Sequence, residues 1–199
     1  MNIAIASFKG GVGKTTTAIH IATFLGRLAP TLLIDGDPNE SAHDYAEQGT
    51  MPFTVVRASD DYSPADFTHI VIDSEPRVSK EDLETLVAQM DLIIIPSQAD
   101  ATALRVLQKS IITLREMNAK NYKVLLTIVH PYPTADGKEA QEYLESLEIP
   151  VFSTVIRRYI AYSKASLLGI SVDTVIDDRA DAAWSDYENV AKEIINYDN

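Results

Sequence analysis

Eight residues near the start of the chain combine glycine, lysine and threonine in a pattern suited to holding phosphate. Residues 9–16 read K-G-G-V-G-K-T-T and directly follow a short apolar run. Glycines lack a Cβ, so the backbone can turn tightly and direct its N–H groups at phosphate oxygens. The spacing Gly-x-x-x-x-Gly-Lys-Thr is a Walker A loop when it leaves a strand and opens a helix. The sequence predicts both, with a strand over residues 2–7 and a helix over residues 15–28.

The side chains of this loop divide the work of holding a nucleotide and its metal ion. Lys14 is expected to reach the β- and γ-phosphates, and the Thr15 hydroxyl is expected to hold Mg²⁺. A second lysine, Lys9, stands just ahead of the glycines. We expect it to bring charge to the γ-phosphate, including that of a partner subunit's nucleotide, in the manner of an arginine finger. The residues expected to bind the nucleotide are Gly10, Gly11, Val12, Gly13, Lys14, Thr15 and Thr16.

Three aspartates follow apolar runs, as metal-binding and catalytic carboxylates do at strand ends. Asp73 ends the run over residues 69–72 and is expected to hold Mg²⁺ through a water, as a Walker B aspartate does. Asp35 and Asp37 follow residues 32–34. Two carboxylates beside a triphosphate require a cation or water between them. We therefore expect Asp35 to reach the metal through water and Asp37 to orient the attacking water. Taken alone, the segment also fits a proline turn with an aspartate cap.

Strand-like and helix-like runs alternate along the whole chain, which favours βαβ units and a mostly parallel sheet. In such sheets the ligand lies beyond the carboxyl ends of the strands, where the loop and the aspartates would meet. The sequence predicts one doubly wound α/β domain over residues 1–199 with helices on both faces. The expected strands span 2–7, 32–34, 53–56, 69–72, 92–95, 123–129 and 151–156, and the expected helices start near 15, 79, 101, 136, 161 and 182.

Composition excludes several kinds of site and leaves one question of charge open. The chain has no cysteine, which rules out disulfides and thiolate metal sites, and its four histidines lack metal-ligand spacing. No secretory signal pattern opens it. Its net charge is −12, yet residues 105–164 hold nine Lys/Arg against six Asp/Glu. Such a basic sector either holds a polyanion or forms ordinary solvated helix faces.

These segments resemble the ParA/MinD family of ATPases. Residues 9–16 match its deviant Walker A box, and residues 35–39 (D-G-D-P-N) are similar to its Asp-x-Asp-Pro-Gln segment. Residues 70–73 resemble its Walker B strand, residues 92–96 resemble the strand that follows, and residues 154–158 resemble its C-terminal Ile-Arg segment. The likeness runs almost from end to end. It is greatest for the short ParA-type partition ATPases, which lack an N-terminal helix-turn-helix domain.

The resemblance implies a Mg²⁺-dependent ATPase that closes as a homodimer around two ATP molecules. Lys9 would cross to the partner's phosphates, Lys14 and Asp37 would serve hydrolysis, and Thr15, Asp35 and Asp73 would hold the metal. The ATP-bound dimer would bind nucleoid DNA without sequence preference in the cytoplasm. A ParB-like or other adaptor protein would stimulate hydrolysis and release it, and the cycle would position a plasmid, a chromosome or a protein cargo. The DNA contacts are expected from Arg105, Lys109, Arg157, Arg158 and Lys164.

Two segments depart from the family pattern. Asp73-Ser74-Glu75-Pro76-Arg77 replaces the common Asp-x-Pro-Pro, and we expect Glu75 to pair with Arg77 rather than to act on the water. Residues 130–133 (H-P-Y-P) stand where a base-contacting loop is expected. The base is expected to be adenine, because no Asn-Lys-x-Asp stretch that would read guanine appears.

Two alternatives share the predicted fold. A MinD-like membrane protein would need a basic amphipathic C-terminal helix, whereas residues 184–199 contain one lysine and several acidic residues. We therefore expect that helix to pack on the domain and the membrane to be no partner. A metabolic enzyme would need a substrate-binding insertion, for which the length leaves little room.

Overall fold

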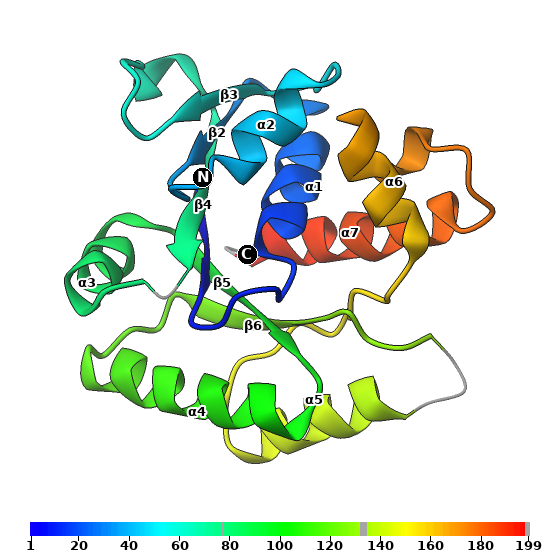
Figure 1. Cartoon of the computed structure of the whole chain (residues 1–199). Helices are drawn as coiled ribbons and strands as arrows, with labels where there is room; N and C mark the ends of the chain where they lie inside the picture. Colours follow the sequence, from blue (N-terminus) through cyan, green and yellow to red (C-terminus); the bar gives the residue numbers. More distant parts are fainter. Residues whose placement is uncertain (77, 132–134, 198–199) are drawn as a thin grey trace.

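The structure is a computed structural model that describes residues 1–76, 78–131 and 135–197. The described residues form six strands and seven α-helices, which alternate from β1 to α5 except between β3 and β4, and three helices follow β6 (Figure 1). The strands are β1 (Asn2–Ser7), β2 (Thr31–Asp35), β3 (Thr54–Arg57), β4 (His69–Pro76), β5 (Leu92–Gln98) and β6 (Tyr122–Thr127). The helices are α1 (Lys14–Gly26), α2 (Ser41–Glu47), α3 (Lys80–Gln89), α4 (Ala101–Glu116), α5 (Asp136–Ser146), α6 (Ile160–Leu168) and α7 (Ala180–Ile195), with 3₁₀ turns η1 (Pro64–Asp66) and η2 (Val172–Thr174).

The strands form one parallel sheet in the order β3-β2-β4-β1-β5-β6. β1 lies between β4 and β5, so the loop that leaves its carboxyl end emerges near the middle of the sheet (Figure 1). Asp35 pairs in register with Asp73, and Asp73 pairs with Ile5. The strand register thus brings the acidic strand ends beside the glycine-rich loop, which confirms the doubly wound α/β prediction.

Two apolar cores sandwich the sheet, because each central strand buries side chains on both faces. On β5, Leu92 and Ile94 belong to one core, whereas Ile93 and Ile95 belong to the other. Helices α1, α2, α6 and α7 cover the first face, and α3, α4 and α5 cover the second (Figure 1). α7 buries Ala183, Tyr187, Val190 and Ile194 in the first core. Its apolar face therefore packs on the sheet side, as predicted for the C-terminal helix.

Pro96 does not end β5, contrary to the sequence prediction. β5 continues to Gln98, and Pro96 pairs with Leu125 in register. The Ile93 N–H points to β6, where it donates to the Asn121 carbonyl. Because successive N–H groups of a strand point to alternate neighbours, the backbone nitrogen of residue 96 faces β1. The pairing of β1 with β5 already ends at Ile94. The missing N–H of proline costs no ladder hydrogen bond there.

The prediction of a seventh strand over residues 151–156 is wrong. This segment runs beside β6 but makes only isolated bridges, Val124 with Val151 and Val129 with Arg157. The ladder breaks at Ser153 and Thr154, whose N–H groups donate to the Glu193 carboxylate at 3.0 and 2.9 Å instead. A carboxylate from α7 thus accepts the hydrogen bonds that a strand carbonyl would accept in a regular sheet.

α2 was not expected from the sequence, since its seven residues carry little apolar periodicity. Asp35 explains it, because its carboxylate accepts the N–H groups of Ala42 and His43, both at 2.8 Å. The helix start expected near residue 79 is confirmed, with Ser79 capping α3 by accepting the Asp82 N–H. Within the described residues, the helices are all too short or too polar to cross a bilayer.

Candidate functional site

The glycine-rich loop has the backbone that a phosphate-binding loop requires. Gly11 and Gly13 have φ values of 73° and 78°, which side-chain-bearing residues rarely adopt. A Cβ built on Gly10 or Gly11 would meet no atom within 4 Å, so the backbone there is open to an approaching ligand. Thr127, at the end of β6, donates its hydroxyl to the Val12 carbonyl at 2.8 Å. The loop is thus held from a neighbouring strand, with its N–H groups left for a ligand.

Lys14 and Thr15 converge on one buried carboxylate. Lys14 Nζ and Thr15 Oγ1 each donate to Asp73, at 2.7 Å to separate oxygens. Asp73 is completely buried, and burial raises its pKa, although the lysine and the hydroxyl act in the opposite direction. An ammonium group, a hydroxyl and a carboxylate therefore stand together at the base of the loop. These groups fit phosphate and Mg²⁺, since Mg²⁺ prefers oxygen ligands.

Asp37 is the second carboxylate near Lys14. Its Oδ2 lies 3.6 Å from Lys14 Nζ, and its side chain is only 9% exposed. Its Oδ1 accepts the backbone and side-chain N–H groups of Asn39, both at 2.9 Å. Asn39 thus orients Asp37 and leaves one carboxylate oxygen facing the loop. That oxygen can accept a hydrogen bond from a water molecule.

Asp35 binds backbone N–H groups on both sides of its carboxylate. Its Oδ2 caps α2, and its Oδ1 accepts the Asp37 N–H at 3.0 Å. Both oxygens are engaged by backbone donors, and the residue is 3% exposed. Asp35 thus shapes the segment that carries Asp37.

Lys9 lies partly buried at the other side of the loop, where its Nζ donates to Gln98 Oε1 at 3.4 Å. Gln98 ends β5, so Lys9 is steadied from a neighbouring strand end. The predicted pairing of Glu75 with Arg77 lies outside the described residues, because Arg77 is one of those that the structure does not describe.

Two cavities adjoin the loop. One, of about 200 Å³, is lined by loop residues together with Ser7, Asp37 and Pro76. The other, of about 390 Å³, starts at Gly13 and Thr16 and extends over the residues of the Ile-Arg segment and three tyrosines, Tyr159, Tyr162 and Tyr187. The first suits phosphate groups, and the second offers aromatic walls to a flat ring.

Beneath α1, a buried polar cluster supports the loop. His20 stacks on Tyr187 with ring centroids 4.8 Å apart, and its Nδ1 lies 2.7 Å from the Thr16 carbonyl. Nδ1 therefore carries the proton and donates to that carbonyl. Complete burial lowers the pKa of His20 to about 4, so the ring is neutral at pH 7. Thr17 Oγ1 and Tyr187 Oη share a hydrogen bond of 3.1 Å, which ties the start of α1 to α7.

The five basic residues expected at DNA do not share one environment. Arg157 donates to both oxygens of Asp186, with a shortest distance of 2.6 Å, and Asp186 raises its pKa. Lys164 donates to Asp177 at 2.8 Å. Arg105, Lys109 and Arg158 are exposed and make no ion pair with other described residues. The charged groups of three of the five residues are thus not engaged in an ion pair with other described residues.

The family can now be stated on direct evidence. The family model described as "CobQ/CobB/MinD/ParA nucleotide binding domain" matches residues 3–172, most of the chain. The chain belongs to this family. The match spans the loop, all three aspartates and the Ile-Arg segment, which confirms the resemblance noted in the sequence.

Curated relatives cover almost the whole chain. "Maintenance of carboxysome distribution protein A" of Gloeobacter kilaueensis is 32% identical over 96% of this chain and 93% of its own length. The "Chromosome-partitioning ATPase Soj" of Thermus thermophilus is 29% identical over 85% of this chain and 86% of its own. Family membership therefore rests on the full chain rather than on the loop alone.

Solved structures share the fold. A putative plasmid partition protein of Borrelia burgdorferi bound to AMPPNP superposes with a TM-score of 0.76, at 20% identity over 98% of each chain. The ATP complex of a Cyanothece McdA point variant gives a TM-score of 0.74, at 19% identity over 98% of this chain and 96% of that one. These likenesses confirm the predicted architecture.

Sequence reasoning missed several residues that build the site. Thr127, Tyr187 and Asn39 hold the loop and Asp37, and Asp186 neutralises Arg157. A strand-end threonine beside the expected ligand edge could have drawn attention to Thr127. Asn39 lies only two residues from Asp37, within the segment recognised in the sequence. Tyr187 and Asp186 carry no local signal, since their partners lie on different elements.

Proposed function

We propose that this protein is a ParA-type ATPase that dimerises on ATP and positions a cargo through cycles of partner-stimulated hydrolysis. The observation that carries the proposal is the convergence of Lys14, Thr15 and Asp73, with Asp37 beside Lys14. A glycine-rich turn that binds nothing has no reason to place an ammonium group and a hydroxyl on a buried strand-end carboxylate. The family match and the carboxysome, plasmid and chromosome relatives support the cargo-positioning role.

The residues of the loop have separate duties in hydrolysis. Lys14 and the N–H groups from Gly10 to Thr16 bind and neutralise the phosphates. Thr15 and Asp73 would hold Mg²⁺, which when bound offsets the charge that develops on the β- and γ-oxygens. Asp37, oriented by Asn39, positions the attacking water through its free oxygen. Asp37 is close enough to Lys14 for its charge to be stabilised while it does so.

The larger of the two cavities is the place for adenine. It begins at Thr16, where α1 starts, and its aromatic and aliphatic walls suit a planar base. Lys9, on the opposite side of the loop, is the residue we assign to the partner's phosphate in the homodimer. Its single long hydrogen bond to Gln98 leaves it free to exchange that partner for an anion.

DNA contacts on this cytoplasmic, nucleoid-associated protein are assigned first to the free cations, Arg105, Lys109 and Arg158. Lys164 and Arg157 would have to give up Asp177 and Asp186 before they could bind phosphate. Replacing Arg157 with Glu would also place two carboxylates face to face. The informative variant is Arg105→Glu/Lys109→Glu, because Arg158 also lines the cavity assigned to adenine.

The experiment measures binding to nonspecific duplex DNA with ATP and with ADP across a salt series, with Asp37→Ala to trap the ATP state. ATP-dependent binding that weakens steeply with salt is expected. Arg105→Glu/Lys109→Glu should reduce the salt slope by about 2 and remove most binding. Lys80→Glu/Lys120→Glu, with the same charge change at other exposed sites, is the matched control. Equal binding with both nucleotides would overturn the proposed switch.

A further inference from the structure

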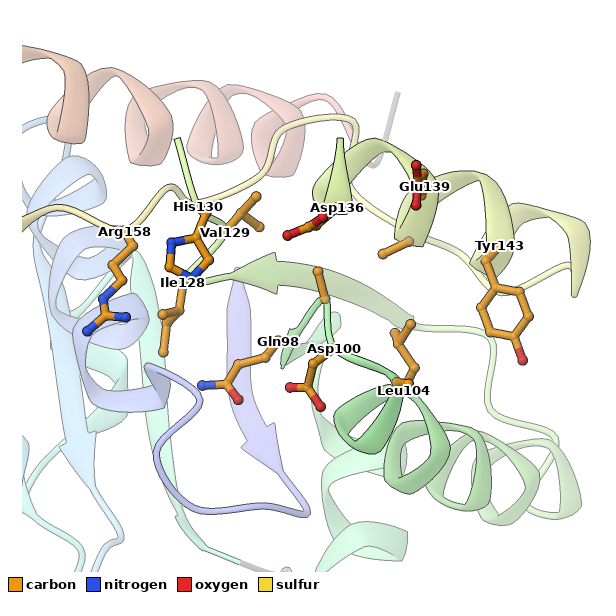
Figure 2. A pocket seen from close by; sticks show the side chains of 13 residues that line it. Gln98, Asp100, Leu104, Ile128, Val129, His130, Asp136, Glu139, Tyr143 and Arg158 are labelled. Carbon is orange, nitrogen blue, oxygen red and sulfur yellow. The ribbon is translucent and has the colours of Figure 1, made fainter. Parts of the chain in front are cut away.

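A third cavity lies beside the nucleotide site and is not used by the proposed hydrolysis cycle. It measures about 560 Å³ and sits at the carboxyl ends of β5 and β6. Gln98 and the first turn of α4 form one wall, and the first two turns of α5 form the other, with Arg158 at one end (Figure 2). None of the glycine-rich loop residues 10–16 lines it. We call this cavity the β5–β6 pocket.

The floor of the pocket is apolar and its walls are acidic. Leu104, Val129 and Ala140 line it with aliphatic surface. Asp100, Asp136 and Glu139 bring three carboxylates, against the single guanidinium of Arg158. Figure 2 shows Asp100 and Asp136 on opposite walls, with Glu139 farther along α5 at the rim. Aliphatic surface below acidic groups matches the stem and head of a long cationic side chain.

These carboxylates keep capacity for a partner. Asp100 accepts the N–H groups of Thr102 and Ala103 through Oδ1 alone. Asp136 and Glu139 are exposed and make no ion pair with other residues in the described ranges. Farther along α5, Glu142 pairs with Lys138 at 3.6 Å, so the charge open to a partner is concentrated at the pocket itself. The pocket therefore offers the carboxylates of Asp100, Asp136 and Glu139 to a cation.

Two other classes of ligand fit less well. A DNA phosphate inside the pocket would lie among three carboxylates, whose charge outweighs that of the single guanidinium of Arg158. For a bound metal ion the carboxylates would have to converge. The only group of three such ligands that does so among the described residues is Glu40, His43 and Asp44, on another element. A cation carried on a peptide remains the best match to the shape and charge.

The backbone at the pocket wall carries an independent sign of function. Ile128, which lines the pocket, has φ of 56°, a conformation that β-branched residues rarely adopt. Such strain concentrates at ligand-binding sites. Ile128, Gln98 and Arg158 also line the cavity assigned to adenine, and Gln98 holds Lys9. An occupant of the pocket would therefore touch the same side chains as the nucleotide site.

We propose that the β5–β6 pocket binds a lysine or arginine side chain from a positively charged segment of a partner protein. The proposal rests on the proposed function in one respect, since that segment would belong to the adaptor that resets the ATPase. The binding chemistry itself needs neither nucleotide nor DNA. A failure of the ATPase or DNA assignments therefore leaves the test below readable, and a failure here leaves them standing.

The test measures fluorescence anisotropy of a labelled deca-arginine peptide with the nucleotide-free protein near physiological salt. Asp136→Asn/Glu139→Gln should weaken binding about tenfold, the loss of roughly 0.7 kcal/mol for each of two charge contacts. Asp61→Asn/Asp66→Asn, which removes two exposed charges beyond the opposite edge of the sheet, should change it less than about twofold. Equal weakening in both variants, or no binding to the wild type, would overturn the proposal.

A second variant separates a pocket from diffuse attraction to an acidic protein. Ala101 is exposed and lines the pocket, so Ala101→Trp should fill it without altering any charge or the core. Peptide binding should then weaken about tenfold, whereas Ala88→Trp on α3 should leave it unchanged. Undiminished binding in Ala101→Trp would show that the cavity holds no side chain of the peptide.

Discussion

The nucleotide loop and the basic sector of this protein are both recognisable in the sequence, yet their side chains have different fates in the fold. The loop residues are consecutive and their conformation is set by glycine dihedrals and two strand ends. The basic residues are spread over α4, α6 and the segment between them, and acidic residues elsewhere decide which of them is free. Asp186 engages Arg157 from α7, while its neighbour Arg158 stays exposed. The conformation of a motif that constrains the backbone can be predicted from the local sequence. A count of charges does not predict which charged side chains stay free of ion pairs.

Replacing each of the two lysines of the loop with alanine should give the largest effects and should distinguish their roles. Lys14→Ala should lower ATP hydrolysis by about 1,000-fold, because it removes the cation that neutralises the phosphates and leaves Asp73 buried with only Thr15. Lys9→Ala should lower hydrolysis while nucleotide binding by the monomer persists. Steady-state hydrolysis and binding of a fluorescent ATP analogue would check both. Equal loss of nucleotide binding in the two variants would contradict the assignment of Lys9 to the partner's phosphate.

The support beneath the loop should make stability depend on pH. The folded-state pKa of His20 is about 4, below the ordinary 6.5, so the unfolded chain binds the proton more readily. The contribution is complete above pH 6.5 and is lost as the pH falls toward 4, which amounts to about 3 kcal/mol. Denaturant unfolding of the wild type and of His20→Gln at several pH values would measure it. The same pH dependence in both proteins would show that His20 is not the group responsible.

The ion pair that distinguishes Arg157 from Arg158 should appear in stability measurements. Asp186→Asn should cost about 2 kcal/mol, since Asp186 is buried and accepts both the Arg157 side chain and its backbone N–H. Arg158→Glu should change stability by less than about 0.5 kcal/mol. Thermal unfolding of both variants provides the comparison. A large loss of stability in Arg158→Glu would show that its side chain is not free.

The smallest effect is expected where β6 holds the loop. Thr127→Val keeps the shape of the side chain but removes the donor to the Val12 carbonyl. We expect a loss of about 1 kcal/mol in stability and a several-fold weaker affinity for ATP. Isothermal titration and thermal unfolding would test this. Full nucleotide affinity in the variant would mean that the glycine dihedrals alone hold the loop.

Most of the architecture could be predicted because its signals are short-range. Alternating apolar runs indicated the strands, and Ser79 marked the start of α3. The errors occurred where a distant side chain replaced backbone bonding. Glu193 captured the N–H groups that a seventh strand would have used, and Asp35 capped a helix with little pattern of its own. Neither pairing leaves a trace in the local sequence.

The candidate site divides in the same way. Lys14, Thr15 and Asp73 were assigned together from the loop motif and the strand-end rule, and the structure brings them within hydrogen-bonding distance. The sequence did not reveal that the Asp35 carboxylate accepts a backbone N–H group of the turn that it starts. The sequence did not predict the pocket between α4 and α5, since its walls come from four separate segments.

The hydrogen bonds that hold the glycine-rich loop join parts of the chain that are made at very different times. Thr127 lies 115 residues after Val12, and Tyr187 lies 170 residues after Thr17. During translation the complete motif leaves the ribosome early, long before the groups that fix its shape exist. A nascent or prematurely terminated chain therefore carries the motif without its framework, and competence to hold nucleotide should arise only when α7 has emerged.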